Sequence, residues 1–140
     1  MRYVLDTDCG VAAMRSPTGA SAALVLAALD GRLTLLMSVP LAVEYEAACM
    51  RLEHWSSAGL SEREVGVYLD GLVALATPVK SRFLWRPRLR DPGDEMVLEA
   101  AANGRADAIV TFNIRDFGVI PSQFGVLVSR PAEALRRMRP

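Results

Sequence analysis

Residues 3–8 read YVLDTD, a short apolar run followed at once by two carboxylates, Asp6 and Asp8. An apolar run of this length fits a buried β-strand. Charged groups are costly to bury unless something pairs with them, so two acids at the end of a buried strand need a partner. We expect a metal ion, a phosphoryl group or a solvated strand end at this place.

Outward from this strand, apolar runs and helical patterns alternate along the chain. LTLLMS (33–38), DAIVTF (107–112) and FGVLVSR (124–130) have the composition of strands, and TPVKSRFLW (77–85) has room for one more. Helical patterns lie between them, at residues 20–32, 39–55, 60–76, 94–104 and 131–139. The alternation predicts an α/β fold with a mostly parallel central sheet.

Composition sets the broad class of protein. The 140 residues are 51% hydrophobic and suit one domain that spans residues 1–140. The 16 basic and 16 acidic residues cancel, so net charge favours neither nucleic acid nor membrane as a partner. The two cysteines lack metal-site spacing, and no run reaches the ~18 uncharged apolar residues of a membrane span. We expect a cytoplasmic protein with no membrane partner.

Acidic side chains gather where the predicted strands end, which is where parallel sheets bind ligands. The strand-end groups are Asp6, Asp8, Asn113 and Asp116; Asp91, Asp94 and Glu95 begin the helix at 94–104, and Glu44 lies one turn into the helix after 33–38. Acids brought together repel one another unless cations neutralise them. Oxygen ligands favour Mg²⁺ or Mn²⁺. The single histidine, His54, rules out a two-histidine mechanism and disfavours a zinc site.

Each acid also has a structural interpretation. Asp94 and Glu95 would complement a helix dipole, and Asp91 would serve as a turn residue before Pro92. A lone histidine on a helix, such as His54, is commonly a surface or core residue.

Four ordered segments taken together carry a resemblance: YVLDTD (3–8), RSPTGAS (15–21), LTLLMSVPLAVEYE (33–46) and RDPGDEMVLEAAANGRADAIVTFNIRDF (90–117). They closely resemble the PIN-domain proteins that are toxin components of toxin–antitoxin pairs, of the VapC type. The resemblance implies a three-layer α/β/α PIN-like domain and a ribonuclease that uses Mg²⁺ or Mn²⁺. It also implies a small antitoxin as partner, and a homodimer.

The resemblance assigns site residues by position. The metal-binding and catalytic acids are Asp6, Glu44, either Asp94 or Glu95, and Asp116, with Asn113 as an alternative fourth metal ligand. Thr7 and Thr111 would place hydroxyls beside the metal, and Asp8 stands where the family usually has Asn. Many members have Asp where Asn113 stands, which also leaves open a catalytically decayed PIN-like module that only binds RNA.

A basic segment, KSRFLWRPRLR (80–90), precedes the third acid. Arginines that hold phosphate and an aromatic ring that stacks on a base are a common means of gripping single strands. The residues expected to bind RNA are Arg82, Trp85, Arg86, Arg88 and Arg90. The alternative is a strand edge with solvated charges.

The reaction implied is metal-assisted hydrolysis of a phosphodiester bond, with water as the nucleophile. Its products carry a 5′-phosphate and a 3′-hydroxyl. A competing interpretation is a haloacid-dehalogenase-like phosphatase, in which Asp6 would be the nucleophile and Asp8 the acid–base. That interpretation explains neither Glu44 nor the segment 110–117.

Overall fold

The computed structural model describes residues 1–80 and 88–138. Three of the residues expected to bind RNA, Arg82, Trp85 and Arg86, lie outside the described residues. So does the second half of the segment 77–85, in which a strand is expected, and so does Arg139 of the last expected helix.

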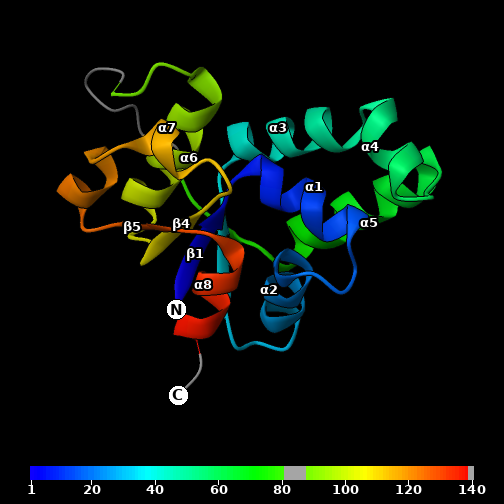
Figure 1. Ribbon diagram of the computed structural model, residues 1–140, viewed down its shortest axis with the longest axis horizontal. Coiled ribbons are helices and arrows are strands. Elements are labelled where there is room, and N and C mark those ends of the chain that lie inside the picture. The colour runs from blue at the N-terminus through cyan, green and yellow to red at the C-terminus, as the bar shows by residue number, and fades with distance from the viewer. Residues whose placement is uncertain (81–87, 139–140) are drawn as a thin grey trace.

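Five parallel strands form the central sheet in the order β3-β2-β1-β4-β5. Figure 1 labels β1, β4 and β5 of this sheet. Their bounds are β1 Arg2–Leu5, β2 Thr34–Met37, β3 Thr77–Pro78, β4 Ala108–Val110 and β5 Leu127–Ser129. Tyr3 of β1 pairs with Leu35 on one side and Ala108 on the other. The apolar runs of β1 and β4 are buried, as expected for strands covered on both faces.

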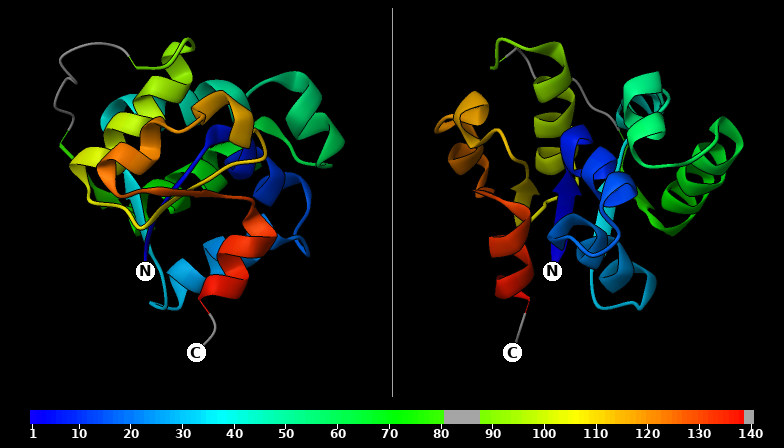
Figure 2. Two further views of the ribbon diagram at one scale, coloured as in Figure 1. Left: turned by 60° about the vertical axis from the view of Figure 1, so that its left-hand side comes forward. Right: turned by 45° about the vertical axis from the view of Figure 1, so that its right-hand side comes forward.

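Helices lie on both sides of this sheet, as the two views of Figure 2 show. Their bounds are α1 Thr7–Arg15, α2 Ala20–Leu29, α3 Val39–Cys49, α4 Leu52–Ser57, α5 Glu62–Leu75, α6 Pro92–Asn103, α7 Ile114–Phe117 and α8 Pro131–Arg137, with a 3₁₀ helix at Ile120–Phe124. Helix α6 packs on β1, β2 and β4, whereas α2 packs against α1 and α8. The predicted three-layer α/β fold is confirmed.

Within the described ranges, no single helix is long and apolar enough to cross a membrane. Helices α1 and α2 together have the length and apolar composition of a span, but the chain bends by 95° between them.

The sequence pattern predicts no helix at residues 7–15, and this prediction is wrong, because helix α1 occupies these residues. Its sequence TDCGVAAMR has weak helix formers in the first turn, so local propensity argues against it. Tertiary packing overrides this: a Cβ added to Gly10 would lie 2.6 Å from Cδ1 of Tyr45 on α3. The hydroxyl of Tyr68 also donates a 2.7 Å hydrogen bond to the Gly10 carbonyl. Gly10 therefore lets α1 approach α3 more closely than any other residue would.

Two other expected helices have different bounds. The helix expected at 39–55 is divided, because Arg51 adopts an extended conformation between α3 and α4. The indole N–H of Trp55 donates to the Met50 carbonyl at this break, at 3.2 Å. Helix α6 begins at Pro92 rather than at residue 94, since the Asp91 carboxylate caps it by accepting from Gly93 N at 2.7 Å.

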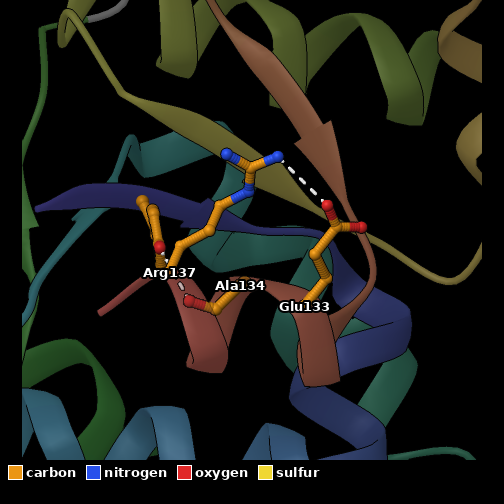
Figure 3. Close-up of polar contacts among 4 residues, drawn as sticks. Glu133, Ala134 and Arg137 are labelled. Atoms are coloured by element: carbon orange, nitrogen blue, oxygen red, sulfur yellow. Dashed lines mark hydrogen bonds and ion pairs between the residues drawn. The ribbon is translucent and has the colours of Figure 1, made fainter. Parts of the chain in front are cut away.

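The C-terminal helix α8 closes over the start of the chain. The buried hydroxyl of Tyr3 donates to the Ala134 carbonyl at 2.8 Å. Figure 3 shows this carbonyl beside an ion pair on the helix surface, in which Arg137 Nη2 lies 3.0 Å from Glu133 Oε1. The helix thereby ties the N-terminal strand to the C-terminal part of the core.

Candidate active site

The site lies where the chain reverses its direction of travel across the sheet. From the central strand β1 the chain proceeds to β2 on one side, and it later adds β4 on the other. Such a switch leaves a crevice at the carboxyl ends of the two strands. Asp6 follows β1 and Thr111 follows β4, and Asp6 N donates to the Val110 carbonyl at 2.8 Å, which keeps these two ends together.

Asp6 is held on both carboxylate oxygens. Its Oδ1 accepts a 2.8 Å hydrogen bond from Thr7 N, and its Oδ2 accepts one of 2.8 Å from the Thr111 hydroxyl. The residue is only 6% exposed. Burial, and then the charge of Asp8, raise the pKa of Asp6 to about 6, and the hydrogen bonds oppose that rise. The side chain is thus fixed in place while its charge is poorly compensated.

Asp8 lies in the first turn of α1 and faces the end of β4. Its Oδ2 accepts from Phe112 N at 3.0 Å and from the Asn113 amide Nδ2 at 3.2 Å. Its Oδ1 is buried and has no hydrogen-bond partner in the described chain. Buried polar atoms are nearly always bonded, so this oxygen is suited to a ligand or a cation. Asn113 uses its amide to orient Asp8.

Asp94 approaches the same point from the first turn of α6. Burial raises its pKa to about 6, and the charges of Asp6, Asp91, Asp116 and Asp8 add to the rise, Asp6 most among them. Mutual repulsion of this kind is characteristic of functional sites. Four carboxylates from three parts of the chain therefore act on Asp94.

Glu95 points elsewhere. Its carboxylate accepts from Arg88 N at 3.1 Å and from Leu89 N at 2.9 Å. It thus fastens the segment before α6 to the first turn of that helix. The structure separates the two neighbours that the sequence leaves as alternatives: Asp94 faces the other acids, and Glu95 supports the loop.

Asp94 and Asp116 line a cavity of about 490 Å³. Arg88 and Arg90, which are the described members of the set expected to bind RNA, also line it, as does Arg115. Acidic and basic groups therefore stand side by side at this edge of the sheet.

Glu44 is half-buried on α3, and its side chain forms no hydrogen bond or ion pair with residues 1–80 or 88–138. Across those same residues, no group of three or more His, Cys, Asp and Glu side chains is spaced to hold a metal ion. Asp6, Asp8 and Asp116 lie within electrostatic range of Asp94, whereas no hydrogen bond or ion pair among the described residues joins Glu44 to these acids.

A second cavity contains residues to which the sequence interpretation assigned no functional role. Arg15, Arg51, His54 and Phe112 line it together with Asp8. Arg15 lies two helical turns after Asp8, so the two residues share one face of α1. This relationship would have linked Arg15 to the site if the sequence had predicted helix α1.

Comparisons with known proteins identify the fold and the family of the chain. A crystal structure of VapBC2 from Rickettsia felis, bound to a DNA fragment from the promoter, matches with a TM-score of 0.62 and 17% sequence identity. The match covers 93% of this chain and 98% of that chain, and it shows a shared fold. No curated protein matches the sequence. A family model described as the PIN domain matches residues 2–115, from β1 into α7. The chain therefore belongs to the PIN-domain family.

Proposed function

We propose that this PIN domain is a ribonuclease that hydrolyses RNA phosphodiester bonds with Mg²⁺ or Mn²⁺, and that it is the toxin of a toxin–antitoxin pair. The observation that carries the proposal is the convergence of Asp6 and Asp94, each with its pKa raised to about 6. Burying carboxylates together is unfavourable unless a cation joins them.

The oxygen donors present are of the type that a hard divalent cation prefers, although the described side chains are not spaced around one. All the converging donors are carboxylate oxygens, and Asp8 contributes a buried oxygen without a hydrogen-bond partner. Asp6, Asp94 and Asp116 would hold the ion, and Glu44 is the proposed fourth acid. When bound, such an ion lowers the pKa of a water molecule and neutralises charge on the phosphate.

The protein's own groups would position the acids and the strand. The Thr7 amide and the Thr111 hydroxyl orient Asp6, and Asn113 orients Asp8. Arg88 and Arg90, beside Asp94 and Asp116, would hold phosphates that the acids alone would repel.

One alternative is set aside and another is kept. Membership of the PIN family replaces the phosphatase interpretation. A decayed module that only binds RNA remains a second candidate, because Asn113 presents an amide that donates to Asp8 rather than a charged oxygen. Asp116 favours the nuclease, since its charge acts on Asp94.

The proposed partners are a small antitoxin and a second copy of this chain. The similarity to a VapBC2 complex supports the antitoxin. A groove of about 240 Å³ between α3 and α5, lined by Val39, Ala42 and Val73, offers an apolar surface for a protein contact. Light scattering on the purified chain, with and without the protein encoded beside it, tests both.

The function is tested with end-labelled single-stranded RNA and Mn²⁺. We expect cleavage that EDTA abolishes, with 3′-hydroxyl products, and loss of cleavage in Asp6→Asn. Asp70→Asn, which neutralises an exposed acid on α5, is the matched control and should cleave normally. RNA that is bound but not cleaved would favour the decayed module, and cleavage in EDTA would refute the metal-dependent mechanism.

A further inference from the structure

A cavity of about 500 Å³ extends from the acidic site along one face of α1. Thr7 and Asp8 line the end nearest the acids, and Arg15 lines the far end. Two turns of helix, ~10 Å, separate the α-carbons of Asp8 and Arg15. We call this space the α1 cavity. It is continuous with the site, and its volume is in the range of ligand-binding pockets.

The far end of the α1 cavity is basic. Arg51, between α3 and α4, and His54, on α4, line this end together with Arg15. Arg15 Nη1 lies 3.4 Å from His54 Nδ1, a contact that leaves the guanidinium without a neutralising acid. No carboxylate in residues 1–80 or 88–138 forms an ion pair with Arg15 or Arg51. Two arginine side chains without a neutralising acid, at the end of a cavity, can bind an anion there.

Phe112 lines the α1 cavity at its acidic end and is 42% exposed. Its backbone N–H donates to Asp8 Oδ2, and Thr111, the residue before it, donates to Asp6. The backbone that carries the ring is therefore tied to the acids. A large exposed aromatic ring has an apolar face to offer a ligand.

We propose that the α1 cavity binds the nucleotide of a single-stranded RNA that adjoins the scissile phosphate. Phe112 stacks on the base, and Arg15 and Arg51 hold the phosphate. The inference rests on the proposed function, since it assigns the substrate contact of that site. Base stacking on an aromatic ring combined with arginine on phosphate is how single strands are held without sequence reading.

The arrangement favours RNA over a segment of a protein partner as occupant. The acids lie between two basic cavities, one with Arg15 and Arg51 and the other with Arg88 and Arg90. A polyanion that crosses the acids needs cations on both sides, and the molecule provides them. A protein segment would have no equivalent need for arginines at both ends.

The test measures affinity separately from cleavage. In an Asp6→Asn background, fluorescence anisotropy gives the Kd for a fluorescein-labelled single-stranded RNA of ~12 nucleotides. The double variant Arg15→Ala with Arg51→Ala should raise Kd by about tenfold or more and lower the salt slope by about 1.4, since each lost phosphate contact on a single strand lowers it by about 0.7. Phe112→Leu should raise Kd by about tenfold, and Phe112→Tyr should restore it because the ring still stacks.

Arg32→Ala is the matched control. Arg32 precedes β2 at the opposite end of the sheet, and its contact with Asp30, at 3.7 Å, is exposed. Its Kd should stay within about twofold of the parent, as expected for an exposed charge outside the binding surface. The Kd for an RNA duplex should also respond less to Phe112→Leu, because its bases are stacked internally.

Equal Kd values for the parent, the double arginine variant and Phe112→Leu would overturn the inference and leave the α1 cavity to a protein contact. That outcome is distinct from failure of the proposed function, which shows as absence of RNA cleavage by the wild type with Mn²⁺. Loss of affinity in both cavity variants, with Arg32→Ala unchanged, supports the inference whether or not cleavage occurs.

Discussion

The Thr111 hydroxyl donates a 2.8 Å hydrogen bond to Asp6 Oδ2 across 105 residues of chain. It joins the end of β4 to the end of β1 and opposes the rise in the pKa of Asp6. The same hydrogen bond therefore holds β1 and β4 together and favours the ionised form of Asp6.

Thr111→Val removes this donor while keeping the shape of the side chain. A hydrogen bond to a charged group contributes about 1.5–3 kcal/mol, so we expect a loss of ~2 kcal/mol in the free energy of unfolding at pH 8. Urea unfolding measures this, and cleavage should also slow. Thr111→Ser keeps the hydroxyl and should behave nearly as wild type; equal losses in both variants would show that packing, not the hydrogen bond, matters.

The stability of the metal-free protein should fall as pH rises from about 4 to about 6. The pKa values of Asp6 and Asp94 are raised from 3.8 to about 6, so the folded state binds more protons than the unfolded state in this window. Thermal unfolding in EDTA checks the direction. For Asp94, which is partly exposed, screening reduces the effect to ~1 kcal/mol. Asp94→Asn should flatten the profile, and a steeper fall in the variant would contradict this.

Asp94 and Glu95 should respond oppositely to neutralisation. Asp94→Asn removes a repelled charge, so we expect higher stability in EDTA at pH 7.5 and loss of cleavage. Glu95→Gln weakens the contacts to Arg88 N and Leu89 N, so we expect ~1 kcal/mol lower stability with cleavage retained. Calorimetry and the RNA assay separate the two, and a Glu95→Gln variant that is stable but inactive would reverse the assignment.

Gly10→Ala should destabilise the fold by ~1–3 kcal/mol, because the new methyl group would overlap the ring of Tyr45. Gly66→Ala on α5 is the matched control. No atom lies within 4 Å of its added Cβ, so it should stabilise the protein by up to ~1 kcal/mol. Chemical denaturation of both variants measures the contrast, and a harmless Gly10→Ala would show that α1 and α3 can separate at little cost.

The strands and most helices could be predicted from the sequence because their signals are local. The runs of β1 and β4 are short and apolar, and α5 begins with a Ser61–Glu64 capping box, whose residue spacing is a local sequence pattern. Helix α1 could not be predicted, since its stability comes from the contact of Gly10 with Tyr45, which no local pattern contains.

The site was predictable in composition and only partly in detail. Acids at strand ends identify the crevice, and Asp6 and Asp94 meet there. Asp94 and Glu95 differ in the direction in which each side chain leaves the first turn of α6, and Glu95 is hydrogen-bonded to the preceding loop. Which of the two is the third ligand stays a prediction. The roles of Glu44 and of the acids as metal ligands stay predictions.

The measurement that tests the central claim most directly is a calorimetric Mn²⁺ titration of the wild type, Asp94→Asn and Glu95→Gln. We predict that the wild type and Glu95→Gln bind the ion, and that Asp94→Asn loses at least ~10-fold in affinity. Binding by the wild type should also release more protons at pH 6 than at pH 8, because the pKa values of Asp6 and Asp94 are about 6. Absence of Mn²⁺ binding in the wild type, or equal affinity in Asp94→Asn, would contradict the account.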